Sequence, residues 1–224
     1  MEISDLSRHV WRGMRAELGR ATIPTGFAEL DRHLPGGGWP RGAIIEIFVE
    51  RYGVGELSLL IPALGALTRV AAPSVKWIAW IAPPLIPYAP ALEQRGVRTD
   101  RLLMIHPSAN NKDCLWAVEQ VLRSGTSSGV LAWIAQANDV VLRRLQLAAE
   151  ERDCWVVLFR PHRALRHRSP AALRIKLTQH AESIGIEIVK CRGGRPGIVN
   201  IALPGIAQPV SIDSGSLEAR SGAG

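Results

Sequence analysis

The sequence has 224 residues, of which 47% are hydrophobic and 21% charged, and its formal net charge is +7 at pH 7. This composition is typical of one folded domain with a full hydrophobic core, and it excludes a disordered chain. The positive charge permits an acidic partner such as nucleic acid without identifying one. The charged N-terminus argues against a secretory signal, and prolines interrupt the longest apolar stretch, residues 75–92, which excludes a transmembrane helix there. We therefore expect a cytoplasmic protein.

Strands and helices alternate over most of the chain. Residues 3–19 place apolar side chains at helical spacing and predict an amphipathic helix. Further apolar runs predict strands at 43–48, 75–82, 101–107, 129–135 and 154–161, with helices at 57–70, 91–96, 111–124 and 139–152. We expect Pro62 to interrupt the first of these helices and Asp139 to cap the last. Such alternation indicates an α/β fold with a largely parallel central sheet.

The pattern changes after residue 160. A basic loop at 162–171 precedes three short strand-like runs at 172–178, 184–191 and 197–204. The turn RGGRPG between the last two runs predicts an antiparallel C-terminal hairpin. We divide the chain into an N-terminal interaction helix (1–20), a core (21–205) and a flexible C-terminal tail (206–224).

Residues 44–60, IIEIFVERYGVGELSLL, have the outline of a phosphate-binding loop between a strand and a helix. In a working loop, a lysine that reaches the terminal phosphates and a hydroxyl that holds Mg²⁺ follow the last glycine. Here Gly53 and Gly55 are followed by Glu56, Leu57 and Ser58. A carboxylate about 4 Å from a phosphate charge costs on the order of 4 kcal/mol at an effective dielectric of about 20. We predict a strand-to-helix joint with Glu56 in the first helical turn, where the helix dipole favours an anion.

The segment TGFAELDRHLPGGGWPRGAIIEIF resembles the lead-in of the RecA-like ATPases, and this likeness spans about residues 20–205. It implies a RecA-like P-loop core. Within this superfamily the stretches GVGELSLLIPALGALT, WIAWIAPPLIPYAPALEQRGV and RGGRPG resemble the ImuA family, a RecA-like component of a bacterial damage-inducible mutagenesis cassette. The SulA family of cell-division inhibitors shares the middle of this text, but its members are shorter and lack the C-terminal strands.

The resemblance also implies that catalytic groups are missing. Glu56 stands at the position of the lysine and Leu57 at that of the Mg²⁺ ligand. Pro83 replaces the catalytic glutamate, and Trp133 replaces the acidic residue that ends a later strand. Three segments each lack a group that ATP hydrolysis needs, so we expect a pseudo-ATPase without enzyme activity or a cofactor. An ATPase with a nonstandard loop is the alternative.

Basic side chains gather at and after the end of the strand at 154–161. Arginine grips phosphate through its planar guanidinium, and in RecA-like proteins a loop in this position contacts DNA. The candidate DNA-binding residues are Arg160, His162, Arg163, Arg166, His167 and Arg168, extended by Arg192 and Arg195 in the RGGRPG turn. The alternative is a solvated loop whose charges aid solubility. No aromatic residue is interleaved for base stacking, which argues against a single-strand binding site.

Tryptophans and cysteines are assigned to the core. The tryptophans expected there lie on predicted strands and helices: Trp77, Trp80, Trp116, Trp133 and Trp155. Cys114, Cys154 and Cys191 are far apart and match no metal-binding spacing. We expect buried, reduced thiols and no metal site.

The ImuA resemblance implies a non-catalytic adaptor in SOS-induced translesion DNA synthesis, associated with the nucleoid when induced. The implied partners are ImuB, which is an inactive relative of the Y-family polymerases, RecA, and the error-prone homologue of the DNA polymerase III α-subunit. A homo-oligomer is a further hypothesis. The SulA likeness leaves a second hypothesis, a division inhibitor that binds FtsZ. The basic loop separates the two, because it lies beyond the region that SulA proteins share.

Overall fold

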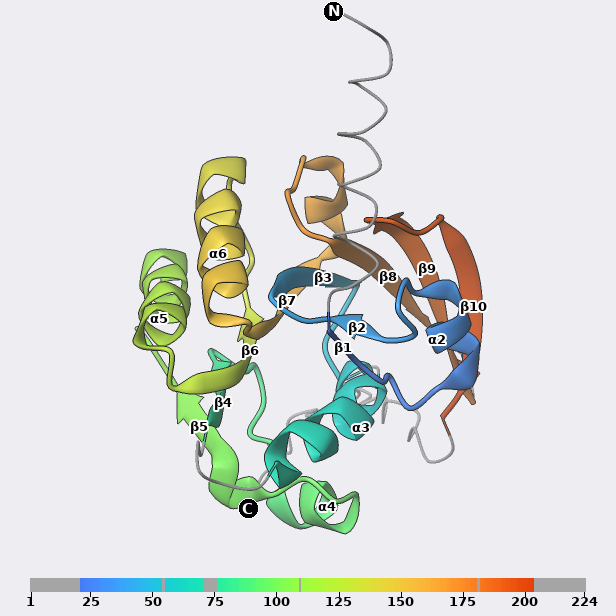
Figure 1. Ribbon diagram of the computed structural model, residues 1–224, viewed down its shortest axis with the longest axis horizontal. Coiled ribbons are helices and arrows are strands. Elements are labelled where there is room, and N and C mark those ends of the chain that lie inside the picture. Colours follow the sequence, from blue (N-terminus) through green and yellow to red (C-terminus); the bar gives the residue numbers. More distant parts are fainter. Residues whose placement is uncertain (1–20, 54, 71–75, 109, 181, 204–224) are drawn as a thin grey trace, which may run out of the picture.

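The computed structural model describes residues 21–53, 55–70, 76–108, 110–180 and 182–203. The predicted N-terminal helix (3–19) and C-terminal tail (206–224) lie outside these residues. Within them the chain forms an α/β fold around an eight-stranded, mostly parallel sheet, which confirms the predicted fold class (Figure 1). A separate ribbon pairs β1 (Thr22–Ile23) with β2 (Trp39–Pro40).

The main sheet has the strand order β10-β9-β8-β3-β7-β6-β4-β5. Its strands are β3 (Ala43–Val49), β4 (Trp77–Ile81), β5 (Leu102–Ile105), β6 (Ser127–Trp133), β7 (Trp155–Pro161), β8 (Leu173–Gln179), β9 (Ser183–Cys191) and β10 (Gly197–Ala202). The six strands from β8 to β5 in this order pair in parallel, whereas β9 and β10 are antiparallel to their neighbours. The predicted C-terminal hairpin is therefore confirmed as β9–β10.

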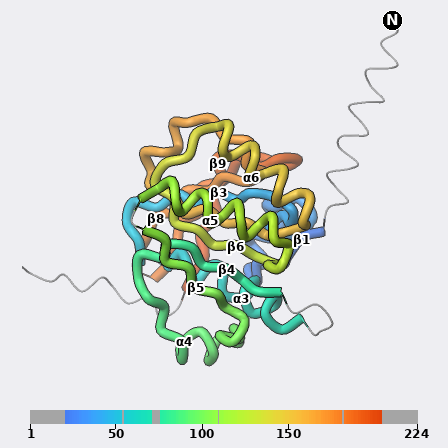
Figure 2. The backbone as a smooth tube through the Cα atoms, turned by 90° about the vertical axis from the view of Figure 1, so that its left-hand side faces the viewer, coloured from blue at the N-terminus to red at the C-terminus, as the bar shows by residue number. Residues whose placement is uncertain are grey.

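Helices cover both faces of the sheet. They are α2 (Ala28–His33), α3 (Glu56–Arg69), α4 (Ala89–Gln94), α5 (Asn111–Ser124) and α6 (Asp139–Arg152), with short 3₁₀ segments η1 (Thr99–Arg101) and η2 (His162–Arg166). Figure 2 shows α5 and α6 side by side over one face, while α3 lies on the other. Helices on both faces are the arrangement that a mostly parallel sheet requires, because each face must be covered.

The two faces of β3 illustrate how the core is divided. Ile45 and Ile47 pack in a cluster with α3, whereas Ile44 packs in a second cluster beneath α5 and α6. All three side chains are fully buried. Successive strand residues point to opposite faces, so a strand with apolar side chains on both faces contributes to both clusters.

Two details of the predicted helices are wrong. The cap of α6 is Asn138, whose side-chain oxygen accepts the Val141 N–H at 2.9 Å. A capping side chain precedes the first helical residue, and Asp139 is already helical. Helix α3 continues without a break through Pro62, whose ring packs so closely on Gly26 that an added Cβ there would lie 2.5 Å away.

The core prediction holds for three of the five tryptophans. Trp80, Trp133 and Trp155 are buried, but Trp77 and Trp116 are 39% and 63% exposed. The prediction is wrong for Trp77 because this residue begins β4 at the rim of the sheet. It is wrong for Trp116 because this residue lies on the outer face of α5. An apolar side chain on an amphipathic helix is buried only on the inward stripe.

The cysteines are free thiols, with Cys114 and Cys154 buried and Cys191 half-buried. Burial raises the pKa of Cys154 to about 12. Among the described residues, no group of three or more His, Cys, Asp or Glu side chains is placed to hold a metal ion. No helix in the same part of the chain is long and apolar enough to cross a membrane.

Candidate functional site

The glycine loop joins the end of β3 to the start of α3, at the carboxyl edge of the parallel strands. Gly53 and Gly55 have φ angles of 82° and 94°, which glycine adopts without steric cost. Glu56 is the first residue of α3, as predicted, and is 4% exposed. Its Oε1 accepts the backbone N–H of Gly53 at 2.9 Å. The chain's own carboxylate thus binds an amide of the type that cradles phosphate in a working loop.

Tyr52 lies next to this carboxylate. Burial raises the pKa of the Tyr52 phenol, the charge of Glu56 raises it further, and the charge of Arg163 lowers it. Arg163 belongs to η2, the segment that follows β7. The loops after β3 and β7 are therefore close enough for their charges to interact.

A hollow of about 290 Å³ adjoins the glycine loop. Its lining consists of Gly53, Gly55, Glu56, Leu57, Ser58, Trp80, Pro84, Leu85 and Trp133. Trp133, the last residue of β6, stacks on Phe159 with ring centroids 4.7 Å apart and meets Trp80 at 5.8 Å. A nucleotide-hydrolysing site has carboxylates at the ends of its strands. In this hollow the end of β6 instead carries Trp133, which forms an aromatic wall with Trp80.

The remaining degenerate positions carry no acid–base group. Pro83 is buried two residues after the end of β4, and neither Pro83 nor Trp133 has a side-chain oxygen that could hold Mg²⁺ or polarise water. Leu57 is partly buried, and the hydroxyl of Ser58 accepts a hydrogen bond from Arg95 Nη1 at 3.3 Å. The structure therefore gathers most of the predicted degenerate positions around one hollow.

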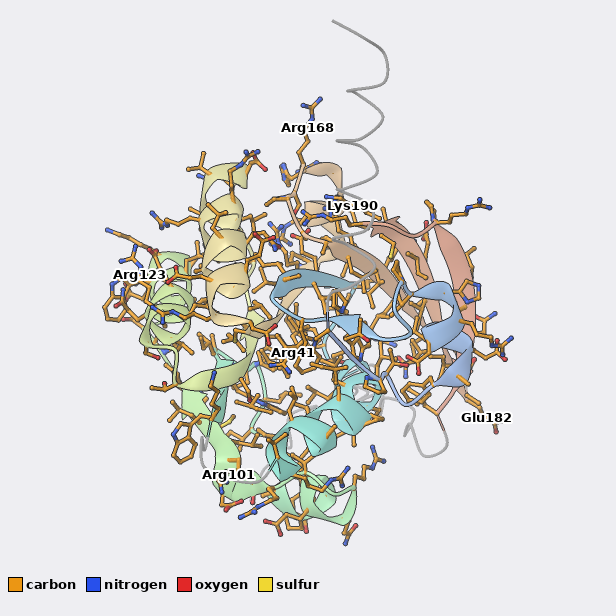
Figure 3. All side chains as sticks on the ribbon, in the orientation of Figure 1. Arg41, Arg101, Arg123, Arg168, Glu182 and Lys190 are labelled. Atoms are coloured by element: carbon orange, nitrogen blue, oxygen red, sulfur yellow. The ribbon has the colours of Figure 1, made fainter. Side chains whose placement is uncertain are left out.

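The basic segment, residues 162–168, starts with η2 and crosses the carboxyl edge after β7. Arg163, Arg166, His167 and Arg168 are exposed, and His162 is half-buried. Figure 3 shows Arg168 projecting away from the body of the molecule. The prediction that this segment presents several cations to solvent is consistent with these positions.

Arg160 does not belong to that surface, and the prediction that it contacts DNA is wrong. Its side chain is 1% exposed and forms an ion pair with Glu46. The reason is strand alternation: Arg160 shares a face of β7 with the buried Val156 and Leu158.

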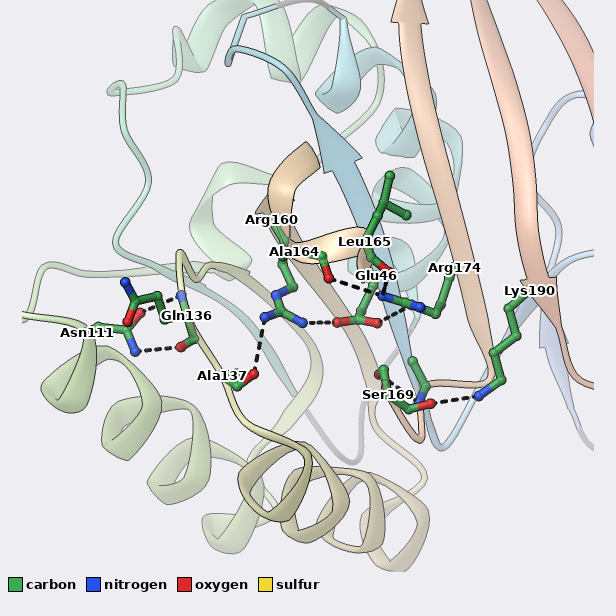
Figure 4. A network of polar contacts seen from close by, with 11 residues as sticks. Glu46, Asn111, Gln136, Ala137, Arg160, Ala164, Leu165, Ser169, Arg174 and Lys190 are labelled. Atoms are coloured by element: carbon green, nitrogen blue, oxygen red, sulfur yellow. Dashed lines mark hydrogen bonds and ion pairs between the residues drawn. The ribbon is translucent and has the colours of Figure 1, made fainter. Parts of the chain in front are cut away.

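Glu46, fully buried in β3, binds two guanidinium groups (Figure 4). Arg160 Nη1 contacts its Oε1, and Arg174 Nε of β8 donates to Oε2 at 2.8 Å. Arg160 Nη2 also donates to the carbonyl of Ala137 at 3.2 Å, and Arg174 Nη2 to that of Ala164 at 3.4 Å. These contacts fasten η2 and the loop before α6 to the centre of the sheet.

The two arginines of the RGGRPG turn have different surroundings. Arg192 is half-buried, donates from Nη2 to the carbonyl of Pro170 at 3.1 Å and lies 3.7 Å from the Glu150 carboxylate. Arg195 is exposed between β9 and β10. Arg192 therefore holds the end of the basic loop in place, and only Arg195 faces water fully.

Sequence reasoning missed Glu46 and Arg174. The available signal was a carboxylate in the middle of the apolar run AIIEIF, because a buried charge requires a partner. The partners, Arg160 and Arg174, lie 114 and 128 residues further along the chain. Only the strand order β7-β3-β8 brings them together.

Fold and site together define an α/β protein, consistent with a RecA-like core, whose glycine loop is occupied by its own glutamate. The chain is similar to two proteins named cell division inhibitor SulA, from Serratia proteamaculans (strain 568) and Serratia marcescens. Each is 25% identical over 126 residues, which span 56% of this chain and 72% of the relative. No family model matches the chain. The similarity to SulA is distant, and much of this chain lies outside it.

Proposed function

We propose that this protein is a non-catalytic RecA-like adaptor in SOS-induced translesion DNA synthesis. The observation that carries the non-catalytic part is the hydrogen bond from the Gly53 amide to the Glu56 carboxylate, 2.9 Å long, in the glycine loop. Pro83 and Trp133, where hydrolysis needs carboxylates, support the same conclusion. The ImuA-like stretches and the distant similarity to SulA support the SOS setting.

The loop electrostatics argue against a bound triphosphate. A phosphate in the loop would have to displace the Glu56 carboxylate or lie beside it. At about 4 Å and an effective dielectric of about 20, that repulsion is on the order of 4 kcal/mol, or about a thousandfold in affinity. No lysine offsets this cost at the position after Gly55.

The work of an adaptor lies in its surfaces. The partners are ImuB, RecA and the error-prone homologue of the DNA polymerase III α-subunit, in the bacterial cytoplasm and at the nucleoid after induction. The exposed Arg163, Arg166 and Arg168 supply salt-sensitive contacts to DNA phosphates. Arg160 is excluded from this role because it is buried.

A division inhibitor that binds FtsZ is the second candidate. The similarity to SulA favours it, because both relatives carry the name of a cell division inhibitor. This function would need neither DNA nor the basic segment.

The test is a pull-down with gel filtration against purified ImuB, RecA and FtsZ, with and without single-stranded DNA at two salt concentrations. Complexes with ImuB or RecA and none with FtsZ support the adaptor. Binding to FtsZ alone overturns the adaptor function and establishes the second candidate.

Nucleotide binding is measured separately, by titrating fluorescent ATP with Mg²⁺. We expect no saturable binding below millimolar nucleotide. Tight binding with turnover would refute the non-catalytic part, whichever partner is captured.

A further inference from the structure

A second hollow, of about 460 Å³, lies on the other side of the carboxyl edge from the glycine loop. Its walls are η2 and the start of α5 and α6, with the loop before α6 between them. The volume falls in the range of ligand pockets, about 300–1,000 Å³. We call it the η2 cleft and define it by Asn111, Gln136, Arg160, Arg163, Arg166 and His167.

The charge of the η2 cleft is one-sided. Arg160, Arg163, Arg166 and His167 line it, and none of the described lining residues is a carboxylate. Helices α5 and α6, each 14 residues long, also begin at its wall, and a helix N-terminus carries a partial positive charge. Arg163, Arg166 and His167 are exposed, so their polar ends are open to a ligand.

The base of the cleft holds an excess buried cation. Two guanidinium groups, those of Arg160 and Arg174, share the single carboxylate of Glu46. The Nε of Arg160 is buried and has no hydrogen-bond partner among the described residues. A buried donor without a partner is costly, and native structures usually pair it with water, an ion or a ligand.

Lys190 holds the end of the same basic loop. Its amine donates to the carbonyl of Ser169 at 2.8 Å (Figure 4). Burial lowers the pKa of Lys190, the charges of Arg192 and Arg174 lower it further, and the charges of Glu46 and Asp139 raise it.

The walls of the cleft are held in a fixed geometry. The Asn111 side chain bridges α5 to the loop before α6, accepting the Gln136 N–H at 3.0 Å and donating to the Gln136 carbonyl at 2.5 Å (Figure 4). Arg160 holds the next residue, Ala137, at 3.2 Å. A preorganised wall lowers the entropic cost of binding a ligand.

From this geometry we propose that the η2 cleft binds a phosphate group, carried by a free nucleotide or by the end of a nucleic acid strand. Arg163 and Arg166 bind the phosphate oxygens, since a guanidinium fork matches phosphate geometry. Arg160 keeps its ion pair with Glu46 and adds a positive charge at the base of the cleft without contacting the ligand. The η2 cleft shares no lining residue with the hollow beside the glycine loop. The proposal does not rest on the partners proposed above.

The experiment titrates the full chain with sodium phosphate by calorimetry, against sodium chloride at equal ionic strength. Arg166→Ala is compared with the matched control Arg168→Ala, because Arg168 is exposed on the same segment but does not line the cleft. Losing one charge-assisted hydrogen bond weakens affinity about tenfold to a hundredfold. We expect this loss for Arg166→Ala and less than a twofold change for Arg168→Ala. Arg163→Ala serves as the second cleft variant, with circular dichroism confirming that each variant is folded.

Further titrations distinguish the sources of the phosphate. Tighter binding of AMP than of adenosine assigns the site to a free nucleotide. Tighter binding of a 5′-phosphorylated oligonucleotide than of its 5′-hydroxyl counterpart assigns it to a strand end. Phosphate binding that is absent, that chloride reproduces, or that Arg168→Ala reduces as much as Arg166→Ala overturns the proposal. The last outcome would leave diffuse DNA binding by the basic segment intact, so the two ideas fail separately.

Discussion

Replacing Glu46 by glutamine should destabilise this protein far more than an isosteric change normally does. Glu46 is fully buried, and among the described residues it is the only carboxylate in contact with the buried Arg160 and Arg174. The amide keeps the shape but removes the charge, and its NH₂ group would face a guanidinium donor. Breaking a buried ion pair from one side costs about 3–5 kcal/mol. For a chain of this size, that corresponds to a fall in Tm of about 6–20 °C.

Urea unfolding followed by tryptophan fluorescence measures this cost, because Trp80 and Trp155 are fully buried and report loss of the core. The matched control is Glu187→Gln. Glu187 pairs with Lys176 at 3.4 Å, but the two side chains are 50% and 35% exposed. We expect this exposed pair to contribute less than about 1 kcal/mol.

A triple variant tests the reason for the effect. Glu46→Leu combined with Arg160→Met and Arg174→Met removes the three charges of this network together, and apolar replacement of a buried ion network is often neutral. We expect it to recover more than half of the stability that Glu46→Gln loses. A loss below about 1 kcal/mol for Glu46→Gln, equal to that of an exposed pair, would refute the argument.

Three further predictions test the glycine loop, the thiols and the backbone. Glu56→Ala should cost about 1–2 kcal/mol in urea unfolding, since it leaves a loop amide without its acceptor, and should not produce ATP binding; a loss near zero would contradict this. Burial raises the pKa of Cys154 to about 12 and that of Cys191 to about 11, and only a thiolate reacts, so a disulfide reagent at pH 8 should label both slowly until urea unfolds the chain. Rapid labelling of native Cys154 would show that it is accessible. Ala82 has a φ of 53°, a conformation that costs a non-glycine residue about 1–2 kcal/mol, so Ala82→Gly should raise Tm by a few degrees, whereas the control Ala79→Gly in β4 should lower it.

The sequence was informative where local pattern decides structure. Alternation of apolar runs predicted the parallel sheet, and the turn RGGRPG predicted the β9–β10 hairpin. The glutamate after Gly55 placed an anion at the start of α3, because a helix N-terminus favours negative charge regardless of the rest of the fold. These features depend on neighbours within a few residues, so short segments of the sequence are sufficient to predict them.

The errors arose where the answer depends on which face of an element is covered. Trp116 is a residue type that is usually found in the core, but it lies on the outer face of α5. Arg160 is a type that is usually found on the surface, but it is buried. In both cases the helix or strand sets the direction of the side chain, whereas the segments that pack against that helix or strand decide whether the side chain is buried. A single sequence indicates the direction but not the burial.

By itself, the sequence determined the order of strands and helices from β3 to β10, the position of the glycine loop and the absence of a lysine after its last glycine. Tertiary structure alone decided that the Glu56 carboxylate accepts the Gly53 amide, that Trp133 stacks on Phe159, and that Glu46 holds two arginines. The physical reason is that sheet order, not sequence distance, sets which side chains meet. Because β3 lies between β7 and β8, two arginines that are each more than a hundred positions from Glu46 bind its buried carboxylate at the base of a basic cleft.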